Sequence, residues 1–308
     1  MPLISSSTKG VFVIAVTPFT PDGDIDWPSL DRVIDFYMEA GADGLTILGM
    51  MGEAPKLTPT EALEITRATL KRMAGRPVIV GVSAPGLAAI RDLTAAVMDE
   101  GASGVLVAPP GSLTTNETIR AYYGNVIDTI GTDVPVCLQD FPLATGVNIS
   151  VPTMNQIFND HPSIVMLKHE DWPGLEKITA IRKAEAAGQV RRSIFVANAG
   201  LFLAEEMRRG ADGSMTGFAY PEMLAQVVKL SEAGDYDRAQ DLFDAYLPLV
   251  RYEAQPGLGL AVRKYVLAKR GAIASPAMRK PGASLSPEAM AEVDFLMGRL
   301  EKRLAELG

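Results

Sequence analysis

The chain is poor in the residues from which disulfides and metal centres are built. Its 308 residues include a single cysteine, Cys137, and two histidines, His161 and His169. One cysteine cannot form an intrachain disulfide, which is typical of proteins of a reducing cytoplasm. A three-histidine metal site cannot be assembled, and a two-histidine site would require both. The sequence therefore argues against a metal-dependent aldolase or hydrolase, and we expect no bound metal.

Long apolar runs and an excess of basic charge are also missing. No run approaches the ~20 apolar residues that a membrane helix requires, and the first residues, MPLISSSTKG, lack the charged and apolar regions of a signal peptide. The net charge of -8 argues against nucleic acid or an anionic membrane as the main partner. Hydrophobic residues make up 47% of the chain, which is enough for a sizeable core. We expect a cytoplasmic globular protein that acts on a small molecule.

A four-residue phrase occurs three times along the chain. Gly41–Gly44 and Gly210–Gly213 read Gly-Ala-Asp-Gly, and Gly101–Gly104 reads Gly-Ala-Ser-Gly. Each phrase follows an amphipathic stretch and precedes an apolar run. The first glycine suits the left-handed residue that ends a helix, so each phrase predicts a junction between a helix and a strand.

The spacing of the apolar runs predicts a closed (β/α)8 barrel. Eight strand-like runs lie near residues 11, 44, 77, 104, 134, 163, 193 and 213, each followed by a helical pattern. Most are continuous, as in strands buried on both faces. The rival, a doubly wound open sheet, would typically carry a glycine-rich phosphate turn after the first strand, where this chain has VTPFTPDG. We expect a barrel over residues 1–234 and helices packed on it over 235–308, as one structural unit.

The candidate catalytic residues follow the sixth apolar run. Lys168 ends the run SIVMLK, and His169 and Glu170 follow it. A lysine amine that is desolvated has a lowered pKa and can attack a carbonyl. Side chains alternate along a strand, so Glu170 should point the same way as Lys168 and act as its general acid or base, while His169 takes a structural role. The alternatives are that Lys168 reaches solvent and that Glu170 only pairs with a cation.

Other candidate substrate-binding residues lie at the ends of other strands, where barrel enzymes place their chemistry. Two glycines, Gly49 and Gly52, flank Met50 and Met51 after the second run, and their backbone N–H groups could face a carboxylate. Gln139 ends the fifth run and could donate to or accept from a substrate. The remaining candidates are Asn198 on the seventh run and Ser214, Met215 and Thr216 on the eighth.

Taken in order, these motifs resemble the dihydrodipicolinate synthase/N-acetylneuraminate lyase superfamily over nearly the whole chain. The residues that carry the resemblance are Thr17-Pro18-Phe19, Gly49-x-x-Gly52-Glu53, Pro142-x-x-Thr145-Gly146, Lys168 and the segment Gly213–Gly217. The resemblance implies class I Schiff-base chemistry on a 2-keto acid with Lys168 as the nucleophile. It also implies a homotetramer or dimer and no cofactor.

Three departures from the family pattern bear on the substrate. Met50-Met51 replaces the usual hydroxyl pair, Gln139 replaces a proton-relaying tyrosine, and Ala144 stands where the synthase has a basic residue for a second carboxylate. The chain therefore looks most like the 2-keto-3-deoxy sugar acid dehydratases of pentose catabolism. This resemblance implies conversion of L-2-keto-3-deoxyarabonate to 2,5-dioxopentanoate and water.

The mechanism expected from this resemblance uses Lys168 to form the imine and Glu170 to remove a C3 proton, while Gln139 orients a substrate hydroxyl. Two alternatives remain open at this point. One is a class I aldolase that cleaves the same sugar acid to pyruvate and an aldehyde, and the other is a non-catalytic sugar-acid-binding protein.

Overall fold

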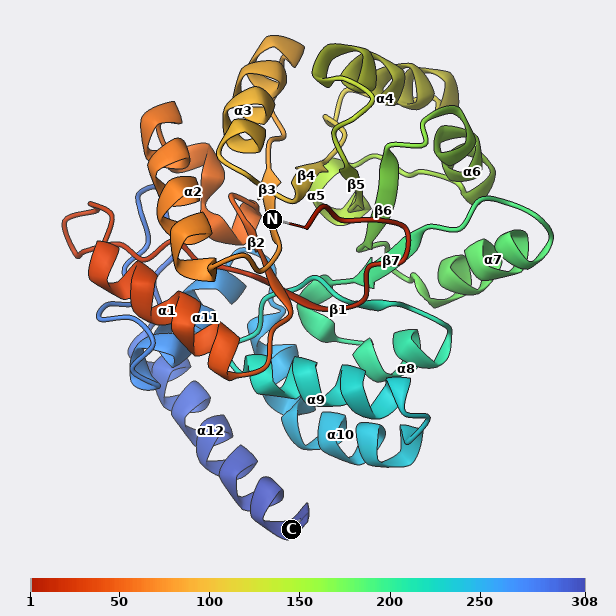
Figure 1. Cartoon of the computed structure of the whole chain (residues 1–308). Helices are drawn as coiled ribbons and strands as arrows, with labels where there is room; N and C mark the ends of the chain where they lie inside the picture. Colours follow the sequence, from red (N-terminus) through yellow and green to blue (C-terminus); the bar gives the residue numbers. More distant parts are fainter. Residues whose placement is uncertain (1, 308) are drawn as a thin grey trace.

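Eight parallel strands form a closed barrel in the computed structural model, which describes residues 2–307 (Figure 1). Each strand pairs with the next along the chain, and the first pairs with the last. The strands are β1 (Gly10–Ile14), β2 (Gly44–Ile47), β3 (Val78–Gly81), β4 (Gly104–Val107), β5 (Val136–Asp140), β6 (Ile164–His169), β7 (Ser193–Val196) and β8 (Gly213–Ser214). The predicted barrel is confirmed and an open sheet is excluded. The outer limits of the two predicted segments, residues 1 and 308, lie outside the described residues.

Helices connect the strands and form the outer layer of the barrel (Figure 1). They are α1 (Trp27–Glu39), α2 (Pro59–Met73), α3 (Leu87–Asp99), α4 (Asn116–Ile130), α5 (Pro142–Thr145), α6 (Val151–Asp160), α7 (Leu175–Ala186), α8 (Leu203–Arg208) and α9 (Pro221–Glu232). Short 3-10 turns cover Met50–Gly52, Ala54–Lys56 and Asn198–Gly200.

The helix-ending glycines and the helix-capping residues have the local structure that the sequence predicts. Gly41, Gly101 and Gly210 have φ values of +94°, +99° and +92°, so each ends its helix in the left-handed conformation that favours glycine. At the start of α2, the Glu61 N–H donates to Thr58 Oγ1 over 3.2 Å, and the Thr58 N–H donates to Glu61 Oε2 over 2.8 Å. This reciprocal capping box satisfies two N–H groups that the first turn would otherwise leave unpaired.

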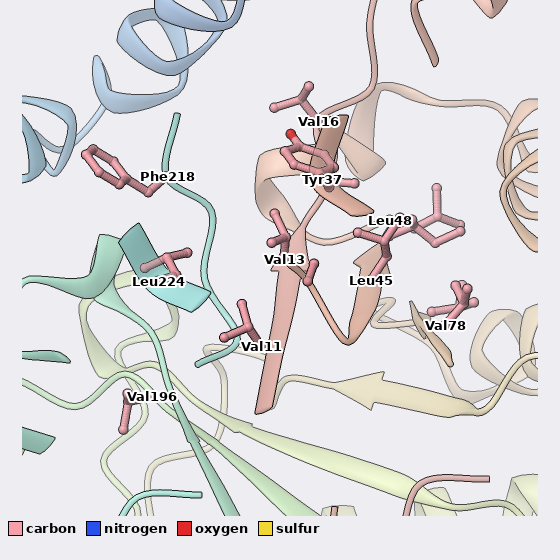
Figure 2. Close-up of a cluster of buried hydrophobic side chains, with 14 of the residues drawn as sticks. Val11, Val13, Val16, Tyr37, Leu45, Leu48, Val78, Val196, Phe218 and Leu224 are labelled. Carbon is pink, nitrogen blue, oxygen red and sulfur yellow. The ribbon is translucent and has the colours of Figure 1, made fainter. Parts of the chain in front are cut away.

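Alternation along the strands divides the buried side chains between two cores. One core fills the barrel and consists of Ile4, Phe12, Ile14, Ile79, Leu106, Cys137, Met166, Phe195 and Met215. The other lies between the strands and the helices, and Figure 2 shows part of it, with Val11 and Val13 on β1 and Tyr37 on α1. The N-terminal segment crosses one end of the barrel (Figure 1), where the Ile4 N–H donates to the Ser103 carbonyl over 2.9 Å.

Three further helices complete the described chain: α10 (Tyr236–Glu253), α11 (Gly259–Lys269) and α12 (Pro287–Leu307). Helix α10 packs against α8, α9, α11 and α12, so the C-terminal helices continue the outer layer on one side of the barrel. Val293 and Leu300 are the buried residues of α12, whose C-terminal end points away from the barrel (Figure 1). Between residues 2 and 307, no helix is both long and apolar enough to cross a membrane.

Candidate active site

Lys168 lies at the end of β6 with its side chain directed into the barrel. It pairs in register with Gln139 of β5 and Phe195 of β7, and Phe195 belongs to the interior core. The lysine is 6% exposed, so the alternative in which it reaches solvent does not hold. Its Nζ atom lies 2.6 Å from Glu170 Oε1. Lys168 and Glu170 therefore point the same way, as strand alternation predicts.

Gln139 contacts the same carboxyl group. Its amide Nε2 donates to Glu170 Oε1 over 2.6 Å, and the glutamine is 5% exposed. One N–H of the amide is thus committed to Glu170, and the second N–H and the amide oxygen are the parts of Gln139 left to contact a substrate hydroxyl. Lys168 and Gln139 both contact Oε1, whereas Glu170 Oε2 makes neither contact. The site is therefore a lysine beside a carboxyl group whose position an amide also fixes.

His169 lies on the opposite face of β6 from Lys168 and is fully buried, so its polar ring supports the end of the strand. Its Nε2 atom lies 3.0 Å from the Gly174 carbonyl oxygen. Nearby, Lys177 of α7 places its Nζ atom 2.6 Å from Asp140 Oδ2 and 2.9 Å from Asp171 Oδ2. Sequence reasoning missed Lys177, because a lysine on an amphipathic helix ordinarily lies on the solvated face. These contacts tie the ends of β5 and β6 to α7 from outside the barrel.

The loop after β2 forms a 3-10 turn over Met50–Gly52. The Gly52 N–H donates to the Gly49 carbonyl over 3.0 Å, and the Gly52 carbonyl accepts from Thr17 Oγ1 over 2.7 Å. The N–H groups of Met50 and Met51 make neither of these bonds, and they remain the predicted donors to a carboxylate. Met51 packs against the interior core, whereas Met50 is 44% exposed. Gly52 therefore supports the loop through its backbone rather than adding a free N–H.

Asn198 lies two residues beyond β7 and begins a 3-10 turn in the left-handed region, with a φ of +50°. Its Nδ2 atom donates to the Asp171 carbonyl over 3.5 Å. The contact links the loop after β7 to the loop after β6, which carries Glu170. Its assignment to substrate binding stays a prediction.

The residues at β8 are divided between the barrel interior and the layer of helices outside it. Ser214 pairs in register with Val11 and Val196, which belong to the outer core, so its side chain points toward the helices and away from Lys168. Met215, which follows β8, packs in the interior core. The assignment of Ser214, Met215 and Thr216 to substrate binding stays a prediction, and the register of Ser214 does not support a contact between its side chain and a substrate beside Lys168.

Glu206 is a further buried carboxyl group, and sequence reasoning missed it. It lies on α8, is 4% exposed, and its Oε2 atom has no hydrogen-bond partner among the described residues. Burial, and to a lesser degree the charges of Glu205 and Glu170, raise its pKa to about 8. The signal was present in the sequence, because Glu206 falls three residues after the buried Leu203 on the inner face of the helix.

Comparison with known proteins identifies the family. The profile of the Dihydrodipicolinate synthetase family matches residues 7–299. The chain belongs to this family. Within it, the chain is 30% identical to an L-2-keto-3-deoxyarabonate dehydratase from Azospirillum brasilense, with 97% of each chain covered. It is 28% identical to a 4-hydroxy-tetrahydrodipicolinate synthase from Parabacteroides distasonis, over 78% of this chain and 80% of that one.

Solved structures of the family have the same fold. A dihydrodipicolinate synthase from Rhodopseudomonas palustris superposes with a TM-score of 0.95 at 53% identity, covering 97% of this chain and 100% of that one. A protein from Pseudomonas aeruginosa described as a putative dihydrodipicolinate synthetase gives 0.87 at 27% identity, covering 96% and 100%. The relatives thus carry both synthase and dehydratase names, and the residues of this chain must decide between them.

Proposed function

We propose that this member of the dihydrodipicolinate synthetase family is a Schiff-base lyase that dehydrates a 2-keto-3-deoxy sugar acid. The substrate we propose is L-2-keto-3-deoxyarabonate and the products are 2,5-dioxopentanoate and water. The observation that carries the proposal is the contact between the Lys168 amine and Glu170 at 2.6 Å, buried at the end of β6. A nucleophilic amine with an acid–base group in reach is what imine chemistry on a ketone requires.

The first step joins the substrate to the enzyme. The Lys168 amine must lose a proton before it can attack the C2 ketone, and Glu170 lies within hydrogen-bond distance to accept it. Attack followed by loss of water gives an iminium ion, which draws electrons from C3 and so acidifies the protons there. The N–H groups of Met50 and Met51 are the proposed donors to the substrate carboxylate.

The second step expels the C4 hydroxyl. Glu170 removes a proton from C3, and the resulting enamine pushes out the hydroxyl, which leaves as water after receiving a proton from Glu170. Loss of the hydroxyl leaves a C3–C4 double bond conjugated with the iminium ion. Removal of a proton from C5 and addition of a proton at C3 convert it to the C4–C5 enol. The enol becomes an aldehyde at C5, and hydrolysis of the imine frees Lys168. Formation of the imine releases one water and its hydrolysis consumes one. The net change is therefore the loss of a single water, the C4 hydroxyl, from the substrate.

Two residues favour a dehydratase over the other activities of the family. An aldolase needs a base for the C4 hydroxyl, and Gln139, which occupies the position of the usual tyrosine, has an amide that cannot act as that base. A synthase needs a cation for a second carboxylate, and Ala144 in α5 carries no charge. The Azospirillum brasilense relative, which matches along nearly the whole chain, supports the same choice.

Product analysis tests the reaction. Incubation with L-2-keto-3-deoxyarabonate should yield 2,5-dioxopentanoate without pyruvate. Release of pyruvate would instead make the protein an aldolase, and formation of 4-hydroxy-tetrahydrodipicolinate in a synthase assay would contradict the proposal.

Borohydride reduction in the presence of pyruvate tests the covalent step. Mass spectrometry should locate the adduct on Lys168, and a Lys168→Ala variant should fold and show neither adduct nor turnover. Lys183→Ala, at an exposed lysine on α7, is the matched control and should behave as the parent. Glu170→Gln should still form the adduct but turn over slowly. A parent protein without an adduct would leave the chain a sugar-acid-binding protein.

A further inference from the structure

Glu53, which follows the turn over Met50–Gly52, is a buried carboxylate with three partners. It is 2% exposed. Its Oε1 atom lies 2.5 Å from Lys264 Nζ, and its Oε2 atom lies 2.7 Å from Lys56 Nζ and accepts from the Arg279 N–H over 3.1 Å. A buried charge is costly unless it is paired and hydrogen-bonded in this way. The Glu53 carboxylate therefore belongs to a buried cluster of paired charges and is not part of a surface ion pair.

Two of these partners come from the C-terminal part of the chain. Lys264 lies on α11, is fully buried, and also donates to the Ala277 carbonyl over 3.0 Å. Its Nζ atom lies 4.6 Å from the centre of the Phe19 ring, and the Arg279 guanidinium lies at the same distance from that ring. These contacts connect α11 and the segment 277–279 to two loops of the barrel. The contact with the loop after β1 is made through Phe19, and the contact with the loop after β2 is made through Glu53.

The backbone that Glu53 anchors is unusual. Glu53 has a φ of +56° and Leu48 has a φ of +55°, both in the left-handed region that non-glycine residues rarely adopt. Such a conformation costs of order 1–3 kcal/mol at each residue and persists only where the surroundings hold it. The two residues flank the turn over Met50–Gly52, and Thr17 Oγ1 fixes the Gly52 carbonyl from the loop after β1. The contacts of Glu53 are therefore what keeps the C-terminal side of this turn in place.

We propose that Lys264 is a positioning residue for the substrate carboxylate, because it holds Glu53 and so presents the N–H groups of Met50 and Met51 to that group. The inference rests on the proposed function, in which this loop binds the carboxylate of a 2-keto acid. It assigns the C-terminal helices a role in the active site: α11 controls affinity for the carboxylate, while Lys168, on a separate strand, forms the covalent bond.

Pyruvate separates the two roles, because it carries the carboxylate and the ketone but no hydroxyl. Adduct formation at Lys168 is measured by borohydride reduction over a range of pyruvate concentrations, and the half-saturating concentration and the maximal yield are compared. Lys264→Met keeps the apolar stem and removes the charge. We expect it to raise the half-saturating concentration by about tenfold or more, since small misplacements of binding groups are costly, with the maximal yield unchanged.

Arg182→Met is the matched control. Arg182 contacts Asp212 Oδ2 over 2.5 Å, at the opposite end of the barrel from Lys168, because Asp212 precedes β8. Like Lys264→Met, this variant removes one cationic partner from a buried carboxylate that keeps other partners, here Arg191 and the Ile194 N–H. It should keep the half-saturating concentration of the parent. Lys56→Met removes only the partly exposed partner of Glu53 and is the milder variant if Lys264→Met does not fold. It should raise the half-saturating concentration by a smaller factor.

The outcomes distinguish this inference from the proposed function. A parent protein that forms no adduct refutes the proposed function and the inference with it. A parent that forms the adduct, with Lys264→Met or Lys56→Met saturating at the same pyruvate concentration, refutes the inference alone. A fall in maximal yield matched by Arg182→Met would also refute it, because the effect would then be one of general stability.

Discussion

Glu206 offers a quantitative test of the buried electrostatics, because its carboxyl group is held protonated in the folded protein near neutral pH. It lies on α8 with 4% of its surface exposed, and burial is the largest cause that raises its pKa from 4.5 to about 8. A pKa difference of this size between the unfolded and folded states corresponds to roughly 5 kcal/mol at 1.36 kcal/mol per pKa unit. Glu206→Gln replaces the carboxyl group with a neutral group of similar shape.

The sign of the pH dependence follows from proton linkage. Below pH 4.5 the carboxyl group is protonated in both states, so its ionisation contributes nothing to the stability. As the pH rises toward 8, the unfolded chain loses this proton while the folded protein keeps it, so the folded state is progressively disfavoured. Above about pH 8 the folded protein ionises as well and the penalty is constant. Glu206→Gln should remove this penalty and stabilise the protein increasingly across this window, by up to roughly 5 kcal/mol.

Urea unfolding followed by circular dichroism, repeated from about pH 5 to about pH 8, measures the effect. The difference in unfolding free energy between Glu206→Gln and the parent should grow with pH. Glu232→Gln, at an exposed position on α9, is the control and should show no such growth. A difference that stayed flat or shrank with pH would mean that Glu206 is ionised in the folded protein, and the assignment of a protonated carboxyl group would be wrong.

Two further predictions concern single contacts at the strands. Gln139→Leu removes the amide that donates to Glu170, so we expect pyruvate to be trapped on Lys168 as in the parent while turnover falls by about a hundredfold, measured as kcat for dehydration; parental turnover would show that this hydrogen bond has no role. Gly213→Ala should prevent stable folding, because the added Cβ atom would overlap the backbone carbonyl of Gly10, whereas Gly298→Ala, with open space in α12, should raise the thermal midpoint slightly; a folded Gly213→Ala variant would contradict the packing of β1 against β8.

The sequence predicts the barrel because its signals are local and repeated. The left-handed glycines at positions 41, 101 and 210 mark helix ends independently of any tertiary contact, and the continuous apolar runs between them identify buried strands. The shared direction of Lys168 and Glu170 follows from the alternation of one strand. Each inference needs only residues that are close in the sequence.

The parts that sequence reasoning misses depend on contacts across the fold. Which face Ser214 takes depends on its register with Val11 and Val196, and β8 has only two residues from which to infer it. The pair formed by Glu53 and Lys264 joins positions 211 residues apart, and no local pattern encodes it. Both cases require the closed barrel and the C-terminal helices to be in place before the partners can be assigned.

Gln139 changes which group can move protons in the proposed reaction. A tyrosine, usual in the family at this position, can both donate and accept a proton, whereas an amide can only hold a hydrogen bond. The contact between Gln139 Nε2 and Glu170 Oε1 becomes more important once Lys168 is bound in the imine, because the lysine nitrogen then keeps a single N–H in place of the three of the ammonium group. The amide remains to keep Glu170 beside C3. Between residues 2 and 307, no ion pair or hydrogen bond joins another titratable side chain to the side chains of Lys168 and Glu170. In the proposed reaction Glu170 therefore takes the C3 proton and also protonates the departing hydroxyl, which suits elimination of water better than cleavage of the C3–C4 bond.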